Sequence, residues 1–179
     1  LFLSSPLETP EVMSGEVDAP GLGGANLHAS RSGIACLVAD DEDDACAIAA
    51  DLLSFLPDHN DAAPPFEETA DPSDRLTEDL ESIVPDNPNK PYDMVKVIET
   101  VVDDGRFVQL FDAYAENIII GFARLGGRSV GVIANQPQVL AGCLDIDASI
   151  KAARFIRTCD AFNLPLLTVE DVPGFLPGV

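Results

Sequence analysis

The carboxyl-terminal third of the chain carries the pattern that most constrains its fold: a strand, a helix and a second strand in immediate succession. Apolar runs at 129–134 and 166–169 predict two buried strands, and a helix opened by Asp147 is predicted over 147–162. The second strand leads into a loop of glycine and proline residues at 173–178. Open α/β folds bind ligands at the carboxyl ends of their strands. The sequence therefore predicts an α/β fold with a candidate ligand-binding loop near its end.

The helix predicted over 147–162 has two faces. One face carries the basic side chains Lys151, Arg154 and Arg157, which we expect to lie in solvent. The spacing of the apolar residues leaves two sets open for the buried face, either Ile150, Ala153 and Ile156, or Phe155, Cys159 and Phe162.

Five consecutive acidic residues at 40–44 mark the start of another helix, just after a strand predicted over 34–38. Carboxylates in the first turn cap free N–H groups and complement the helix dipole. Apolar residues at helical spacing follow, and Pro57 is predicted to end the helix. A divalent-metal site is the alternative for such a cluster. Consecutive residues splay around a helix, however, and cannot converge on one ion.

The second half of the chain begins after an acidic, proline-rich segment at 58–91, which we interpret as an extended connector with one short helix over 74–83. A helix is predicted from residue 92, closed by Asp103-Asp104-Gly105. Gly126-Gly127 then separates two apolar runs, which is a hairpin signal.

The net charge of the chain helps to exclude some classes of function. The net charge is −21, and residues 1–90 contain 20 acidic but only three basic side chains. So few cations are a poor match for the phosphates of a nucleic acid. The acidity fits either a face that docks a partner or a heavily solvated surface. No apolar run approaches the roughly 20 residues of a membrane span. We therefore expect neither a nucleic-acid partner nor a membrane.

Side chains that could hold a metal or act as a nucleophile are sparse. His28 and His59 lie in the acidic half and are interpreted as surface or capping groups. We expect no metal site, and we interpret the cysteines as reduced thiols of a cytoplasmic protein or, in a eukaryote, a protein of the mitochondrial matrix. None of them belongs to a CxxC pair or has a histidine at metal-ligand spacing: Cys36, Cys46, Cys143 and Cys159.

The main candidate for chemistry is the backbone of the loop at 173–178. Gly174 and Gly178 leave room for a ligand, and the flanking prolines stiffen the loop. Main-chain N–H groups exposed at such a place can stabilise an oxyanion. The alternative is a rigid turn that binds nothing. A second polar wall is expected at the end of the neighbouring strand, from Asn135, Gln136 and Pro137.

Two carboxylates, Glu170 and Asp171, stand directly before this loop. They could act as an acid/base pair, but adjacent strand residues point to opposite faces, so at most one faces a given site. The alternative is a structural carboxylate that binds amides of the next loop.

Several sequence words carry a family resemblance. In the second half these are ANQP at 134–137, LAGCLDIDAS at 140–149, KAARFIRTCDAFNLPLLT at 151–168 and DVPGFLPG at 171–178. Upstream words extend it over nearly the whole chain: GLGGANLHASRSG at 21–33, PYDM at 91–94, DDG at 103–105 and NIIIGFARLGGR at 117–128. Together they resemble the carboxyltransferase (beta) subunits of biotin-dependent acyl-CoA carboxylases, above all the propionyl-CoA carboxylases.

The resemblance implies a crotonase-like ββα superhelix, with the end of one domain and the start of a second. Residues 1–60 would end the first, acyl-CoA-side domain, 61–90 would be the connector, and 91–179 would begin the second, biotin-side domain. The chain lacks an initial Met and stops inside its last loop, so we expect an internal piece of a larger polypeptide. The glycine-rich oxyanion motifs of the family are expected outside it.

The implied reaction is transfer of a carboxylate from carboxybiotin to the α-carbon of propionyl-CoA or a similar short acyl-CoA. Main-chain amides form the two oxyanion holes of such enzymes, which suits a chain in which we expect no catalytic side chain. The resemblance places these residues at the border of the biotin pocket: Asn135, Gln136, Pro137, Gly174, Phe175, Leu176, Pro177 and Gly178.

The implied cofactor is biotin on a carrier protein or domain, and the implied substrate is a coenzyme A thioester. The implied partners are a biotin carboxylase or biotin carrier subunit and further copies of the same subunit, as dimers within a hexamer. Two alternatives remain, the acyl-CoA decarboxylase subunit of a sodium pump and a non-catalytic acidic docking module. The isolated chain is expected to be inactive, because both half-sites would be incomplete.

Overall fold

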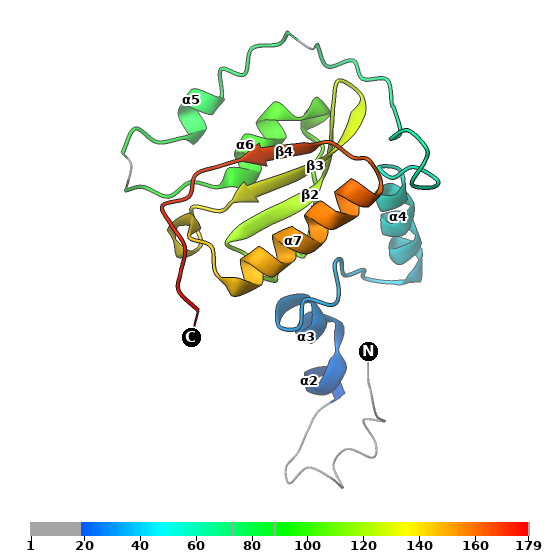
Figure 1. Cartoon of the computed structure of the whole chain (residues 1–179), viewed down its shortest axis with the longest axis vertical. Helices are drawn as coiled ribbons and strands as arrows, with labels where there is room; N and C mark the ends of the chain where they lie inside the picture. The colour runs from blue at the N-terminus through cyan, green and yellow to red at the C-terminus, as the bar shows by residue number, and fades with distance from the viewer. Residues whose placement is uncertain (1–18, 73, 88, 179) are drawn as a thin grey trace, which may run out of the picture.

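The computed structural model describes residues 19–72, 74–87 and 89–178. Most elements surround one four-stranded sheet, and the first two helices stand apart from it (Figure 1). In chain order the elements are α2 (Ala19–Gly23), α3 (Ala25–Ser30), α4 (Glu42–Leu53), α5 (Leu80–Ile83), α6 (Met94–Val101), η1 (Asp103–Gly105), β1 (Val108–Leu110), β2 (Ile118–Leu125), β3 (Arg128–Asn135), η2 (Leu140–Gly142), α7 (Ile146–Ala161) and β4 (Leu166–Val169).

The sheet is mixed and has the strand order β1-β2-β3-β4. β2 pairs antiparallel with both β1 and β3, whereas β3 and β4 are parallel, with α7 as the crossover between them. β2 and β3 form the predicted hairpin, which closes at the pair Leu125 and Arg128. Its turn residues Gly126 and Gly127 have φ angles of 57° and 77°. Two residues with positive φ are what a two-residue type I′ turn requires.

Alternate residues of β2 feed two hydrophobic cores, one on each face of the sheet. Ile120 and Phe122 pack with Phe155 of α7 in one core, and Ile119 packs with Ile98 of α6 in the other. Figure 1 shows α7 in front of the sheet and α6 behind it. The result is three layers, and the carboxyl ends of the parallel strands β3 and β4 meet at one edge of the middle layer.

α7 differs from its prediction at its start and in its buried face. Asp145, rather than Asp147, is the N-cap, and its carboxylate accepts a hydrogen bond from the amide of Ala148. Ile150 is 43% exposed, so the helix buries the alternative apolar set, to which Phe155 belongs. The helix starts earlier than predicted because Asp145, which lies outside the helix, accepts a hydrogen bond from a free amide of the first turn.

Two further predictions about burial are wrong. Lys151 was expected in solvent, yet it is only 4% exposed, because carbonyl groups of segment 111–118 surround its ammonium. β4 was expected to be buried on both sides. Instead Leu166 and Thr168 face outward, since within the described residues β4 pairs with β3 alone and forms an edge of the sheet.

The first half of the chain keeps less regular structure than predicted. Residues 34–38 form no strand, although the Cys36 carbonyl accepts a hydrogen bond from the Phe111 amide at 2.9 Å. α4 begins after Asp41 as predicted but ends at Leu53, before Pro57. The short helix predicted over 74–83 shrinks to the four residues of α5.

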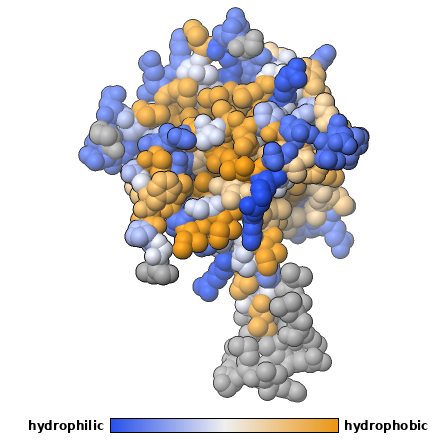
Figure 2. Space-filling model, viewed as in Figure 1, coloured by the Kyte–Doolittle hydropathy of each residue, from blue (hydrophilic) through white to orange (hydrophobic). Residues whose placement is uncertain are grey.

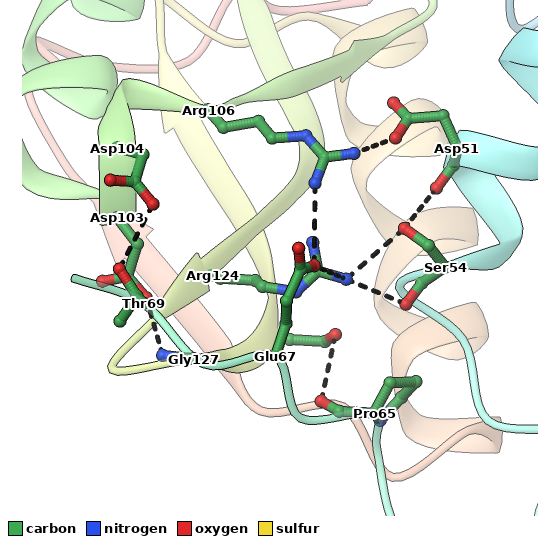
Figure 3. Close-up of polar contacts among 11 residues, drawn as sticks. Asp51, Ser54, Pro65, Glu67, Thr69, Asp103, Asp104, Arg106, Arg124 and Gly127 are labelled. Carbon is green, nitrogen blue, oxygen red and sulfur yellow. Dashed lines mark hydrogen bonds and ion pairs between the residues drawn. The ribbon is translucent and has the colours of Figure 1, made fainter. Parts of the chain in front are cut away.

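A buried arginine joins α4, the connector and the hairpin (Figure 3). Arg124 of β2 is 8% exposed, and its Nη2 lies 3.0 Å from a carboxylate oxygen of Glu67 and donates to the Ser54 carbonyl at 3.0 Å. Its guanidinium covers the Phe55 ring, 4.3 Å from the ring centroid. The Glu67 amide also donates to the Gly127 carbonyl at 2.9 Å. These contacts fasten the connector along the hairpin turn.

Candidate functional site

A cleft of about 630 Å³ lies at the edge of the sheet where β3 and β4 both end. Because the two strands are parallel, the loops that follow them meet there, as in other open α/β sheets. The last part of the connector forms the opposite wall. The cleft is lined by Val84, Pro85, Asp86, Asn87, Asn89, Lys90, Pro91, Tyr92, Pro137, Gln138, Ala141, Asp171 and Pro173.

Asn135 and Gln136 are buried behind the cleft, and their side chains bind other parts of the protein. Asn135 Nδ2 donates to the Gly142 carbonyl at 3.0 Å. Gln136 Oε1 accepts from the Met94 amide at 3.2 Å, and its Nε2 donates to Asp93 Oδ1 at 2.8 Å. The Gln136 amide is bound to a backbone carbonyl as well. The expected polar wall therefore positions η2 and the start of α6, and Pro137 is the member of the three that lines the cleft.

The turn η2 brings the β3 loop close to the loop after β4. Leu140, Ala141 and Gly142 have φ angles of 52°, 53° and 78°, so three consecutive residues are left-handed. Such backbone is unfavourable for non-glycine residues and persists only where its surroundings enforce it. A Cβ on Gly142 would lie 2.7 Å from the Asp171 carbonyl oxygen, so glycine is required for this approach. One wall of the cleft thus rests on a strained turn.

The loop at 173–178 is open to solvent but partly bound along its backbone. The Leu144 amide donates to the Gly174 carbonyl at 3.2 Å, and the Leu176 amide donates to the Leu144 carbonyl at 2.8 Å. The Leu176 amide is therefore unavailable to a ligand. A Cβ on Gly174, by contrast, would have no atom within 4 Å, and within residues 19–178 the Gly174 amide has no hydrogen-bond acceptor. Among the predicted residues of this loop, Gly174 thus has an open approach, and its role at a biotin pocket stays a prediction.

Tyr92 was missed by sequence reasoning, although it belongs to the word PYDM. Its hydroxyl donates to Asp171 Oδ2 at 2.8 Å and closes one end of the cleft. Burial, helped by the hydrogen bond and the charge of Asp171, raises the pKa of Tyr92 to about 12. Asp171 is thus a structural carboxylate as the alternative prediction held, but it binds a phenol rather than amides of the next loop.

A second hollow, of about 330 Å³, lies between the loop at 173–178 and the first part of α7. Ile146, Ile150, Phe175 and Leu176 are exposed along it, with Phe175 75% exposed. Figure 2 shows hydrophobic surface gathered on the face that carries α7 and the end of the chain. Gly174 stands between Pro173, which lines the first cleft, and Phe175, which lines this hollow.

The other candidate groups stay away from this edge. His28 lies on α3 and His59 in the segment after α4, and neither lines the cleft. Among the residues that the structure describes, no group of three or more His, Cys, Asp or Glu side chains could hold a metal ion. No helix in the described part of the chain has the length and apolar content that a membrane crossing needs.

Curated relatives match along almost the whole chain. The chain is 49% identical over 178 residues to the propionyl-CoA carboxylase beta chain of Roseobacter denitrificans. This match covers 99% of the chain and 35% of that protein. The chain is 51% identical to the methylmalonyl-CoA decarboxylase subunit alpha of Veillonella parvula, with the same coverage. The human mitochondrial propionyl-CoA carboxylase beta chain is 47% identical and is covered over 33% of its length. The chain spans about a third of the length of these relatives.

Solved structures agree with these relatives. A transcarboxylase 12S structure with hydrolysed methylmalonyl-CoA bound matches with a TM-score of 0.92 and 47% identity. The match covers 99% of this chain and 34% of the transcarboxylase chain. A single-chain, multi-domain long-chain acyl-CoA carboxylase has a TM-score of 0.81 at 28% identity, over 99% of this chain and 17% of that one. The crotonase-like fold expected from the sequence is thereby confirmed.

The family model of the carboxyl transferase domain matches residues 1–179. It covers the cleft, the strained turn and the glycine-proline loop together, and the resemblance seen in the sequence words is confirmed. The chain belongs to the carboxyl transferase domain family.

Proposed function

We propose that this chain forms the biotin-side wall of a carboxyltransferase that moves a carboxylate from carboxybiotin to the α-carbon of propionyl-CoA or a similar short acyl-CoA. The names of the relatives support the reaction class, and the cleft at the carboxyl edge of β3 and β4 supports the site. The observation that carries the proposal is Gly174: a Cβ there would meet only open space, and its chain neighbours Pro173 and Phe175 line the cleft and the second hollow.

The residues present suit a small bicyclic urea. Pro137, Ala141 and Pro173 give the cleft apolar walls, and Gln138 and Asn89 add polar groups for a ureido ring. When bound, biotin would supply the nitrogen that carries the carboxyl group. The chain's own task is to hold the reacting groups in a fixed orientation, which can account for several kcal/mol of barrier reduction.

The domain organisation is part of the proposal. Residues 1–60 would end the acyl-CoA-side domain, 61–90 would connect, and 91–179 would begin the biotin-side domain. The sheet and both of its cores draw mostly on residues after 91, which supports the second boundary. The buried Arg124 supports a connector that is fastened to the biotin-side domain rather than loose.

The proposal also covers the partner subunits and the cellular location. We infer a biotin carboxylase or biotin carrier partner, and dimers within a hexamer; hexamer assembly is stated for the transcarboxylase 12S neighbour. We also infer a cytoplasmic location, or the mitochondrial matrix in a eukaryote; the names of the mammalian relatives support only a mitochondrial location in eukaryotes. A second candidate function is decarboxylation of methylmalonyl-CoA, which the 51% identity to a decarboxylase subunit favours.

The test is Gly174→Val in the full-length polypeptide, assembled with its biotinylated partner. Carboxylation of propionyl-CoA should fall at least tenfold while the unfolding midpoint stays unchanged, because the added side chain meets only open space. Ala161→Val, at the exposed end of α7, is the matched control and should keep full activity. Unchanged carboxylation by the Gly174 variant would favour a non-catalytic docking module. Transfer of the carboxylate from methylmalonyl-CoA to the biotinylated partner tests whether the protein also runs the reaction in reverse.

A further inference from the structure

The buried ammonium of Lys151 binds the loop between β1 and β2. Lys151 Nζ donates to the carbonyls of Phe111, Tyr114 and Ile118 at 2.8, 2.7 and 2.8 Å, with the Ala115 carbonyl at 3.3 Å. Phe111 and Ala115 have φ angles of 53° and 45°, and this left-handed backbone bends segment 111–118 around the ammonium. A buried cation needs such partners, because an unpaired one is very costly.

Asn117, the last residue of this loop, is hydrogen-bonded to residues beside the candidate site. Asn117 is 2% exposed, and its carbonyl accepts a hydrogen bond from the Gln136 amide at 3.1 Å. Its Nδ2 donates to the Cys143 carbonyl at 2.9 Å. Gln136 and Cys143 stand at the two ends of the β3 loop, whose residues Pro137 and Ala141 line the cleft. Asn117 therefore joins both ends of the loop that forms one wall.

Lys151 and Asn117 are linked through the backbone. The Ile118 carbonyl, one of the four that bind the ammonium, follows Asn117 directly, and the Ala115 carbonyl accepts the Ile118 amide at 3.1 Å. Within this network the ammonium fixes where Asn117 stands, and Asn117 fixes the loop. Hydrogen bonds that converge on one charged donor are stronger than neutral ones, which suits a positioning role.

We propose that Lys151 is a positioning residue for carboxyl transfer, acting through Asn117 on the β3 loop between Gln136 and Cys143. The inference rests on the proposed function for its consequence in catalysis, but not for the network itself. Lys151 donates to no residue that lines the cleft, so its removal should loosen the biotin-side wall only indirectly, through Asn117.

Hydrogen exchange of the full-length protein tests the network without reference to activity. In Lys151→Met, amides of 136–143 should exchange at least tenfold faster, while those of 120–125 and 128–134 keep their protection. Lys96→Met makes the same chemical change on the exposed side of α6 and should alter neither. Adding Asn117→Ala to Lys151→Met should speed exchange of 136–143 no further, since both act along one path. Unchanged protection in Lys151→Met, or additive effects, overturns the proposal.

Kinetics of transfer from methylmalonyl-CoA to free biotin test the consequence. Lys151→Met should raise the KM for biotin about tenfold, and more than it raises the KM for the thioester. Lys151→Gln, which restores N–H donors, should recover part of this loss and serves alone where the Met variant does not fold. If neither variant folds, Lys151 is a folding residue and the positioning role is rejected. An inactive wild type rejects the proposed function, whereas the exchange experiment still decides the network.

Discussion

Tyr92 and Asp171 stand 79 residues apart in the chain, yet the Tyr92 hydroxyl donates to the Asp171 carboxylate at 2.8 Å. The bond joins the end of the connector to the loop after β4 across one end of the candidate cleft. A contact outside the sheet thus joins two walls of the cleft. Removing the hydroxyl tests both the stability of this wall and its titration.

Tyr92→Phe should lower the free energy of unfolding at neutral pH by about 1 kcal/mol, the usual net value of one hydrogen bond. The pKa of Tyr92 is raised from 10.0 to about 12, so its stabilisation is complete below pH 10 and is lost as pH rises toward 12. The variant should therefore lack this alkaline loss. Urea unfolding between pH 7 and pH 12 measures it.

The phenolate absorbance provides a direct check, because the chain has two tyrosines. The proton that Tyr92 releases near pH 12 in the wild type should be absent from Tyr92→Phe. Tyr114→Phe is the matched control, since burial raises the pKa of that phenol as well. If Tyr92→Phe titrates like the wild type, the contact does not persist in solution.

Lys151 gives the opposite pH dependence. Burial lowers its pKa from 10.5 to about 8, against the charges of Asp112 and Glu116. A lowered lysine pKa means that the folded state disfavours the proton, so the penalty is complete below pH 8 and is relieved between pH 8 and 10.5. The free energy of unfolding should rise in that window, by at most about 3 kcal/mol. Lys151→Met should lack the rise; an equal rise in both proteins would contradict the assignment.

The hairpin turn offers a matched pair of substitutions. A Cβ on Gly126 would meet nothing within 4 Å, whereas one on Gly127 would overlap the Glu67 carbonyl oxygen and lie 2.7 Å from the Phe66 ring. Both positions have positive φ, so Gly126→Ala should cost only the left-handed strain, about 1–2 kcal/mol. Gly127→Ala should cost roughly 2 kcal/mol more, because the connector must move. Equal unfolding midpoints for the two variants would show that the connector does not rest on the turn.

Local signals were enough to predict the hairpin, the crossover helix and the cleft edge, because they follow from apolar periodicity and from glycine at defined places. Gly126-Gly127 predicted the turn, and the carboxyl ends of the two strands predicted the edge of the sheet at which a cleft lies. β1 was missed because its three residues, Val108–Leu110, form a strand through pairing with β2 rather than through a pattern of their own.

What the sequence could not provide was the partner of each polar group. Lys151 shares a helix with Arg154 and Arg157, and nothing in its spacing distinguishes it from them. It is buried because carbonyls from a loop more than 30 residues away converge on it. Gln136 was likewise predicted as a wall of the site, but its amide side chain binds the start of α6. Long-range contacts of this kind appear only when the chain is folded.

Arg124→Lys is the sharpest test of how the connector is held. The guanidinium covers Phe55 while donating to Ser54 and pairing with Glu67, which a lysine ammonium cannot do at once. We expect a loss of roughly 2 kcal/mol in unfolding free energy and faster chymotrypsin cleavage after the exposed Phe66. Arg157→Lys, on the exposed side of α7, should change neither. If Arg124→Lys also leaves both unchanged, the charge alone holds the connector and the stacking contributes nothing.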